Sequence, residues 1–278
     1  MEDFKAIRPG QACSFRGNRK RLVYVATDKR RVLFQEIPFY RVGKSAFPTV
    51  NFVCSHRSAP SLKPKMDFDL QIVARHFPEL TDSQIKQFRQ FAELIAEWNQ
   101  KLNLISRADI ENLPLRHILH SLAIAKTLNF EPGTQILDVG TGGGFPGVPL
   151  AILCPDCQFL LIDSVGKKIK AVSNCIESLK LENATAQQTR AENVKSSFDY
   201  VIARAVTQLP KFLSWIRNRI KADGFNALPN GVLCLKGGDL SHEFADLSEK
   251  PELYPIRSYF GYPEFEDKFV VHVPIESK

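Results

Sequence analysis

A glycine-rich stretch preceded by an acid is the part of the sequence best suited to binding chemistry. The apolar run Ile136–Val139 leads into a segment in which Gly140, Gly142, Gly144 and Gly147 lie close together. Glycine lets the backbone adopt positive φ and lets a ligand approach the main chain closely. Doubly wound sheets bind nucleotides where such a segment joins a strand to a helix. The pattern therefore predicts a nucleotide-binding loop.

Two adenosine ligands fit this loop. Gly142, Gly144 and Gly147 satisfy the dinucleotide pattern G-x-G-x-x-G, and Asp163 lies about 20 residues further on. An acid at that point would accept the ribose hydroxyls of either NAD or S-adenosylmethionine. Asp138 separates the two ligands, because a carboxylate beside the loop repels a pyrophosphate but suits an amino group and a sulfonium. The loop therefore favours S-adenosylmethionine, with an NAD-linked dehydrogenase as the alternative.

The segments around the loop alternate between strand patterns and helix patterns. The expected helices are Pro146–Leu153, Gly166–Leu179 and Leu209–Ile220. This alternation predicts right-handed βαβ crossovers and therefore a doubly wound, mostly parallel α/β sheet. Ser258–Tyr262 and Lys268–Ile275 leave no room for a crossover helix and are expected to form an antiparallel pair at the C-terminal edge. The expected parallel strands are Gln135–Val139, Gln158–Asp163, Thr185–Thr189, Asp199–Ala203 and Val232–Leu235.

A small helical part precedes the alternating segments. Thr81–Gln84 matches a capping box, and apolar residues recur at helical spacing from Ile85 to Trp98. A second helix is expected over Leu113–Leu128. We therefore expect three parts: a basic extension over residues 1–65, a helical part over 66–130 and a cofactor-binding domain over 131–278.

The positive charge of the chain is concentrated in its first quarter. The 278 residues carry a formal net charge of +7, of which residues 1–65 contribute +10 and residues 66–278 contribute −3. The β-like runs Leu22–Val25 and Val32–Phe34 could pair, but a two-stranded hairpin is marginal by itself. We expect residues 1–65 to be poorly ordered, and RNA contact by this basic segment is the alternative.

Hydropathy and cysteine use exclude several classes of protein. No apolar run approaches the length of a membrane span, and six cysteines are too few for a disulfide scaffold in a chain of this length. Cys154 and Cys157 are expected in a helix-to-strand turn, and no metal site is expected. The composition fits a protein of the reducing cytoplasm with no membrane partner.

The segment around the glycine-rich loop resembles a known family. Asp138–Leu150, which reads DVGTGGGFPGVPL, and Leu161–Lys168 resemble the ribosomal RNA small subunit methyltransferase G family, also called glucose-inhibited division protein B. The resemblance implies a class I SAM-dependent methyltransferase fold with a small helical N-terminal part. It also implies transfer of a methyl group from S-adenosyl-L-methionine to N7 of a guanine in 16S rRNA. Further matching segments are Trp98-Asn99, Asn103-Leu104, Leu115–Ser121, Arg190–Glu192, Phe198-Asp199, Arg204-Ala205 and Leu235–Gly237.

Three features depart from the family pattern. His120 stands where many members have Asp, so the resemblance assigns it no single role. Lys221–Asn230 is longer than in the shortest members, and residues 1–65 have no counterpart in the family.

The resemblance also assigns a cofactor site. It implies that the backbone of Gly140 and Phe145 lines the methionine end of the cofactor, that Ala191 and Glu192 flank the adenine, and that Arg204 belongs to the same site. By their own pattern, Glu192 would be a surface residue in a turn, and Asp163 either a ribose acceptor or a helix N-cap. The expected cofactor-binding residues are Gly140, Gly142, Phe145, Asp163, Ala191, Glu192 and Arg204.

The expected RNA contacts are Arg116, His117 and Lys236. N7 of guanine already presents a lone pair, so attack on a methyl group requires no prior removal of a proton. We therefore expect no essential catalytic acid or base, and Arg204 to serve positioning. The expected partner is the small ribosomal subunit, and the chain is expected to be a monomer. The alternatives are a class I methyltransferase acting on another RNA or a small molecule, and a non-catalytic RNA-binding protein with a degenerate cofactor site.

Overall fold

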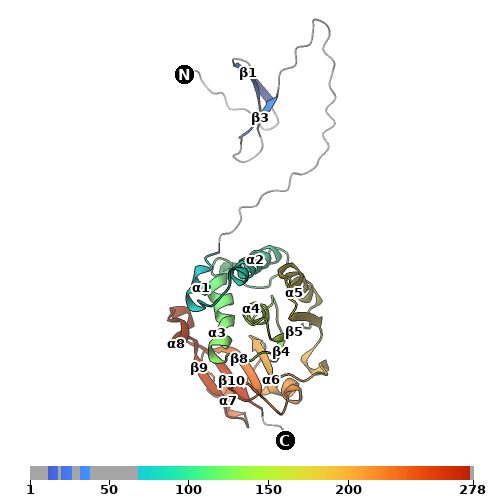
Figure 1. Cartoon of the computed structure of the whole chain (residues 1–278), viewed down its shortest axis with the longest axis vertical. Coiled ribbons are helices and arrows are strands. Elements are labelled where there is room, and N and C mark those ends of the chain that lie inside the picture. The colour runs from blue at the N-terminus through green and yellow to red at the C-terminus, as the bar shows by residue number, and fades with distance from the viewer. Residues whose placement is uncertain (1–11, 18–19, 27–31, 38–67, 276–278) are drawn as a thin grey trace. The chain divides into compact units, whose positions relative to one another are not determined.

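The structure is a computed structural model that describes residues 12–17, 20–26, 32–37 and 68–275 (Figure 1). The chain divides into two units, Met1–Ser61 and Leu62–Lys278. In the described part of the chain, no helix combines the length and the apolar character that crossing a membrane requires.

The first unit contains a three-stranded antiparallel sheet. Its strands are β1 (Ala12–Gly17), β2 (Lys20–Ala26) and β3 (Val32–Ile37), in the order β1-β2-β3. The β-like runs seen in the sequence lie in β2 and β3, where Val25 is paired with Leu33. Strand β1 was not predicted from the sequence. A third strand makes such a sheet more stable than a two-stranded hairpin, which is marginal by itself. The expected divisions at residues 65 and 130 remain predictions, and the Ser/Pro/Lys-rich segment 58–65 lies outside the described residues.

The second unit is built on a seven-stranded sheet in the order β6-β5-β4-β7-β8-β10-β9. Strands β4 to β8 are parallel, whereas β10 runs antiparallel to both of its neighbours, β8 and β9. This confirms the doubly wound, mostly parallel sheet with an antiparallel C-terminal edge. The strands are β4 (Gln135–Val139), β5 (Gln158–Asp163), β6 (Ala184–Gln188), β7 (Tyr200–Arg204), β8 (Gly231–Gly237), β9 (Glu252–Pro255) and β10 (Lys268–Pro274).

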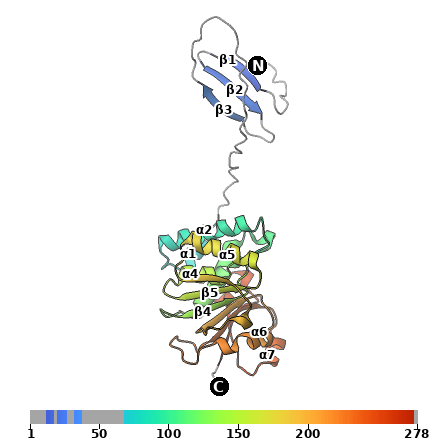
Figure 2. The same ribbon diagram turned by 90° about the vertical axis from the view of Figure 1, so that its right-hand side faces the viewer.

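Helices cover both faces of this sheet (Figure 2). One face carries α1 (Gln71–His76), α2 (Asp82–Trp98), α3 (His120–Thr127), α4 (Gly147–Leu153), α5 (Gly166–Leu179) and α8 (Ile256–Phe260); the other carries α6 (Leu209–Ile216) and α7 (Ser241–Ala245). Successive strand residues point to opposite faces. Accordingly, Ile136 packs under the first set, and Leu137 and Val139 pack against α6.

The helical part agrees with the sequence at its start and differs in detail later. Thr81 and Gln84 form the predicted capping box: the Gln84 amide donates to Thr81 Oγ1 at 3.3 Å, and the Thr81 amide donates to Gln84 Oε1 at 3.0 Å. The second predicted helix is a π-helical turn, Pro114–Leu119, that continues into α3. Such turns are rare in helices and occur often at functional sites.

The strand predicted at Ser258–Tyr262 is wrong, because these residues belong to α8 and its end. Ile256 and Phe260 are spaced so that one helical face buries both, and Gly261, at φ 73°, ends the helix in the left-handed conformation. The aromatic residues that suggested a strand instead fill the core. The strand that pairs with the outer edge of β10 is β9, which ends three residues before Ser258 and lies outside the predicted range.

Candidate active site

Asp138, the next-to-last residue of β4, anchors the glycine-rich loop through its carboxylate. The buried Asp138 Oδ2 accepts hydrogen bonds from Thr141 Oγ1 at 2.6 Å and from the Gly147 amide at 2.9 Å. A Cβ on Gly147 would lie 2.6 Å from the same oxygen, so this position requires glycine. Burial raises the pKa of Asp138 to about 7. Asp138 lines neither cavity, and its Oδ1 is buried with no hydrogen-bond partner among the described residues, so the ligand contact that the sequence suggested for it stays a prediction.

The loop itself follows a path that side chains disfavour. Gly140, Gly142 and Gly144 have φ values of 69°, 59° and 92°. A Cβ on Gly140 would lie 2.9 Å from Val206 Cγ2, so the loop packs tightly against the turn after β7. Glycine is the residue that takes these conformations without strain.

A first cavity, which we call the acidic cavity, lies at the carboxyl ends of β4, β5 and β6 and has a volume of about 240 Å³. Four of the predicted cofactor residues line it: Gly140, Asp163, Ala191 and Glu192. Val206 and Trp215 also line it, and no pattern in the sequence predicted either of them there. The full lining is Val139, Gly140, Ile162, Asp163, Ser164, Thr189, Arg190, Ala191, Glu192, Val206 and Trp215.

Asp163 joins two loops at the floor of the acidic cavity. Its Oδ2 accepts from the Gly142 amide at 3.1 Å, and its Oδ1 accepts from the Val165 amide at 2.8 Å. Asp163 faces the cavity and is not the N-cap of α5, because that position is Val165 and no side chain caps the helix. Each carboxylate oxygen can accept a further hydrogen bond.

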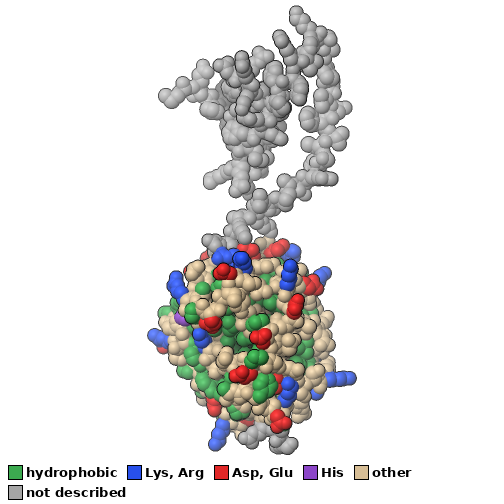
Figure 3. Space-filling view, viewed as in Figure 1, with side chains coloured by type: hydrophobic (Ala, Val, Ile, Leu, Met, Phe, Trp, Pro, Cys, Tyr) green, Lys and Arg blue, Asp and Glu red, His purple; other side chains and the backbone are tan. Residues whose placement is uncertain are grey.

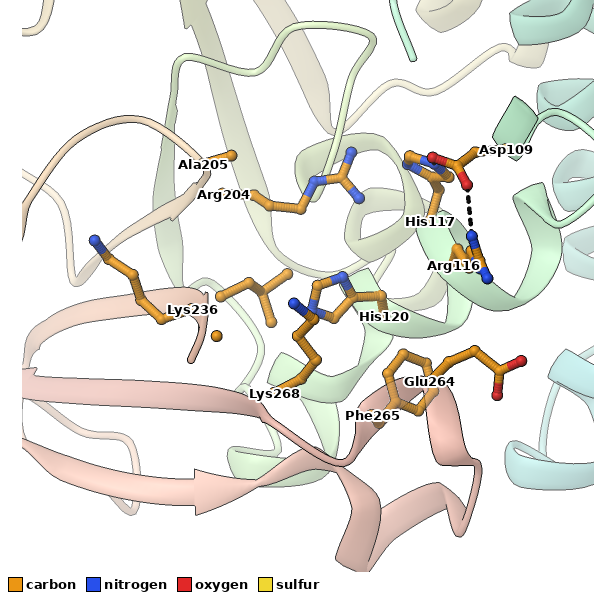
Figure 4. Close-up of a pocket in the computed structure, with 12 residues that line it drawn as sticks. Asp109, Arg116, His117, His120, Arg204, Ala205, Lys236, Glu264, Phe265 and Lys268 are labelled. Carbon is orange, nitrogen blue, oxygen red and sulfur yellow. Dashed lines mark hydrogen bonds and ion pairs between the residues drawn. The ribbon is translucent and has the colours of Figure 1, made fainter. Parts of the chain in front are cut away.

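A second cavity, which we call the cationic cavity, has a volume of about 590 Å³ and lies at the ends of β7 and β8 (Figure 4). All three predicted RNA contacts line it, together with Arg204. The turn after β7 separates the two cavities, because Arg204 and Ala205 face the cationic cavity and Val206 faces the acidic one. The full lining is Asp109, Arg116, His117, His120, Arg204, Ala205, Leu235, Lys236, Gly237, Glu264, Phe265 and Lys268.

Arg204 ends β7 with its guanidinium stacked on an aromatic ring. The guanidinium carbon lies 4.7 Å from the centre of the Phe145 ring. Burial lowers the pKa of Arg204 to about 10, so the side chain stays charged at neutral pH. Among the described residues, no carboxylate forms an ion pair with it. The residue is half-buried and lines the cavity, so its charge is available to a ligand there.

Phe145 and Gly142, two of the predicted cofactor residues, line neither cavity. Phe145 is buried, and its ring centre lies 5.2 Å from that of Phe91 and 5.3 Å from that of His117. Its side chain therefore supports Arg204 and His117 from behind. The Gly142 amide is engaged by Asp163.

Two other cations of the cationic cavity, Arg116 and Lys236, have acidic partners. Arg116 Nη1 lies 2.8 Å from Asp109 Oδ1, and Lys236 Nζ lies 2.7 Å from Glu243 Oε2. Lys236 also donates to the Thr207 carbonyl at 2.7 Å, and in Figure 4 its amine points away from Arg204. Lys236 thus holds the turn after β7 in place through its hydrogen bond to Thr207.

The two histidines of the cavity are neutral. Burial, followed by the charge of Arg204, lowers the pKa of His117 to about 4 and that of His120 to about 3. His117 Nε2 lies 3.9 Å from Asp109 Oδ2, which is too far for a hydrogen bond. Within residues 68–275, His117 Nδ1 and Nε2 and His120 Nε2 are buried and have no hydrogen-bond partner.

The remaining surface offers no broad region of one charge sign on the face shown in Figure 3, where basic and acidic side chains alternate with hydrophobic ones. Residues 68–275 also contain no group of three or more His, Cys, Asp or Glu side chains arranged to hold a metal ion. Cys154 and Cys157 lie in the turn between α4 and β5.

The strand order defines the class of this protein. Counted within the seven-stranded sheet, the order is 3-2-1-4-5-7-6 with the last strand antiparallel, whereas dinucleotide-binding sheets have the order 3-2-1-4-5-6. The inserted antiparallel strand departs from the dinucleotide-binding order and fits the class I SAM-dependent methyltransferase fold that the resemblance implies. It separates this chain from the NAD-linked alternative.

Comparison with known proteins identifies the family. The family profile described as "GidB: rRNA small subunit methyltransferase G" matches residues 84–260. The ribosomal RNA small subunit methyltransferase G of Flavobacterium psychrophilum is 52% identical over 209 residues, which cover 75% of this chain and 100% of the relative. That of Flavobacterium johnsoniae is 52% identical over 206 residues, covering 74% of this chain and 98% of the relative. The chain belongs to the rRNA small subunit methyltransferase G family.

A solved structure of a SAM-dependent methyltransferase from Aquifex aeolicus is also similar. It is 15% identical, covers 62% of this chain and 99% of its own, and has a TM-score of 0.45. The family assignment rests on the sequence relatives.

Proposed function

We propose that the chain transfers a methyl group from S-adenosyl-L-methionine to N7 of a guanine in the 16S rRNA of the small ribosomal subunit. The observation that carries the proposal is the single turn, Arg204–Val206, that forms a wall of both cavities. A methyl donor held on one side of this turn would adjoin an RNA base held on the other. Membership of the family supports the choice of rRNA as the acceptor.

The acidic cavity fits S-adenosylmethionine by its donor set. Asp163 and Glu192 offer carboxylates to ribose hydroxyls and to amino groups, and the bare backbone of Gly140 permits close approach of a ligand. When bound, the cofactor supplies an electrophilic methyl group. Of the residues predicted to hold it, Gly140, Asp163, Ala191 and Glu192 face this cavity, and Arg204 faces the adjoining one.

The residues of the cationic cavity serve to hold and orient the acceptor. N7 of guanine presents its own lone pair, so no side chain removes a proton from it. His117 and His120 have pKa values lowered to about 4 and about 3, so both are neutral at pH 7 and neither is tuned as a base for that pH. Positioning alone supplies roughly 7–11 kcal/mol in well-oriented reactions.

Methylation of the extracted small subunit tests the proposal. Small subunits from a strain lacking the enzyme are incubated with the purified full chain and S-adenosylmethionine, and the modified nucleoside is mapped by mass spectrometry and primer extension. We expect one 7-methylguanosine in 16S rRNA, and a transfer rate that is flat between about pH 6 and 9. Unmodified subunits, or a methyl group on another RNA or another atom, would contradict the proposal.

We further propose that the enzyme works in the cytoplasm, where ribosomal subunits assemble, and as a monomer, since one chain lines both cavities. Size-exclusion chromatography with light scattering measures the second point. A stable dimer would overturn it.

A further inference from the structure

The side chain of Lys268 reaches the cationic cavity by passing over Gly237 in the neighbouring strand. Lys268 is the first residue of β10, and it pairs with Gly237, the last residue of β8, in the antiparallel register. A Cβ built on Gly237 would lie 2.6 Å from Lys268 Nζ and 2.8 Å from Lys268 Cδ. The lysine side chain therefore occupies the space that any other residue at position 237 would fill. In Figure 4 it extends toward His120, inside the cavity.

The acidic residues of the cavity do not neutralise the charges of Lys268 and Arg204. Asp109 pairs with Arg116, and Glu243 pairs with Lys236. Within residues 68–275, Lys268 and Arg204 each form no ion pair, and Figure 4 shows the Glu264 carboxylate turned away from both. Two fixed cations that share a cavity attract an anion there.

The neighbouring histidines contribute no charge and report on these cations. Burial comes first among the causes that lower the pKa of His120 to about 3, and the charges of Arg204 and Lys268 follow. Both cations are therefore close enough to His120 to disfavour a third positive charge. The cavity holds its positive charge on Arg204 and Lys268 instead.

The chemistry of the proposed reaction identifies the anion. Methylation at N7 makes the guanine ring positive, so a lysine beside that ring would oppose the reaction. The phosphodiester groups on either side of the nucleotide stay negative throughout, and lysine binds phosphate as a point charge. A phosphodiester is thus the group that a lysine in this cavity would attract without opposing methyl transfer.

We propose that Lys268, whose side chain crosses Gly237 into the cationic cavity beside Arg204, binds a phosphodiester group of the RNA at the target nucleotide. This inference rests on the proposed function. It makes Lys268 a substrate-binding residue that fixes the RNA backbone while the base faces the methyl donor. The first residue of the reversed strand β10 therefore contributes to the same site as the ends of β7 and β8.

Steady-state kinetics with small ribosomal subunits tests the inference in the full-length Lys268→Gln variant. We expect KM for the subunit to rise about tenfold with kcat nearly unchanged, and the slope of log affinity against log salt to fall by about one unit for 16S rRNA. Lys268→Arg keeps the charge and should restore most of the affinity. Lys86→Gln, on α2 and outside both cavities, is the matched control and should behave as the wild type.

Two control measurements separate loss of RNA binding from loss of the fold or of the cofactor site. Thermal unfolding shows whether Lys268→Gln keeps the fold, and calorimetry with S-adenosylmethionine shows whether it keeps the cofactor site. A folded variant with unchanged KM and unchanged salt slope would overturn the inference, as would a loss confined to cofactor affinity, which would assign the anion to the cofactor carboxylate. Failure of the wild-type chain to methylate the subunit contradicts the proposed function instead, and the salt slope of RNA binding still reports on Lys268.

Discussion

The acidic cavity and the cationic cavity adjoin at one turn, yet different segments and side chains of different charge line them. The acidic cavity takes most of its lining from the loops after β4, β5 and β6, with the carboxylates of Asp163 and Glu192. The cationic cavity takes its lining from the ends of β7 and β8, the start of β10 and the π-helical turn, with Arg204 and Lys268 unpaired among the described residues. The parallel half of the sheet thus offers backbone, two acids and Arg190, whereas the half beside the reversed strand offers two cations without an ion-pair partner.

This difference predicts that the two halves of the sheet bind different ligands. Acids and open glycine backbone suit a ligand that carries hydroxyls, amino groups and positive charge, whereas unpaired cations suit a polyanion. Substitutions in either cavity should therefore affect one ligand, and substitutions in the shared turn should affect both.

The largest effect is expected for Arg204, in the shared turn. Arg204→Ala removes a charge from the cationic cavity and the partner of the Phe145 ring, so we expect kcat/KM for the small subunit to fall about 100-fold, or about 3 kcal/mol. Because Val206 of the same turn packs on Gly140, cofactor affinity should also fall several-fold. Calorimetry and steady-state kinetics measure the two effects. Arg204→Lys should recover part of the RNA effect, and a loss confined to one ligand would show that the turn serves one cavity only.

A smaller effect is expected for Glu192, which belongs to the acidic cavity alone. Glu192→Ala should weaken S-adenosylmethionine binding about tenfold, or about 1.4 kcal/mol, and leave binding of 16S rRNA unchanged. Calorimetry with the cofactor measures the change. Glu182→Ala, an exposed acid outside both cavities, is the control. A change in RNA affinity without a change in cofactor affinity would reverse the assignment of the two cavities.

The smallest effect on ligand binding is expected for Asp138, which supports the loop from beneath. Folding raises the pKa of Asp138 from its ordinary 3.8 to about 7, so the folded state binds a proton that the unfolded state releases. Stability from this group is full below about pH 4 and is lost as the pH rises through 7. The substitution Asp138→Asn keeps the shape of the side chain but removes the titrating group. The decline of the free energy of unfolding with rising pH should therefore be smaller by about 1 kcal/mol or more.

Urea denaturation from pH 5 to pH 8 measures this decline in both proteins. Asp156→Asn, an exposed acid in the turn between α4 and β5, is the control and should leave the pH dependence as it is. Equal pH dependence of the stability in wild type and Asp138→Asn would show that Asp138 is already ionised in the folded protein. It would leave no distinction between Asp138 as a loop anchor and Asp138 as a ligand contact.

The sequence placed the parallel strands to within a few residues and gave most of the candidate site. Strand ends gather at one edge of a parallel sheet, so Asp163, Glu192 and Arg204 could be assigned to that edge from their place in the chain. The error at α8 came from aromatic residues that pack equally well on a strand or on one helical face. Short apolar segments do not distinguish the two by periodicity.

Two features could be found only in the folded chain. The direction of the Asp138 side chain depends on hydrogen bonds to Thr141 and Gly147 that form when the loop closes over it. Whether a cation is paired depends on which acids the fold brings near. Lys236 forms an ion pair with Glu243, whereas Lys268, opposite Gly237 in the strand pair, forms no ion pair within residues 68–275.

The sequence by itself determined the loop, the alternation of strands and helices, and the family, because glycine positions, hydrophobic period and local motifs are properties of neighbouring residues. The tertiary structure decided that the site is two cavities divided by one turn, and which charges in them have partners. That decision depends on the reversed strand β10, which places Lys268 opposite Gly237, and antiparallel register is fixed only when distant strands pair.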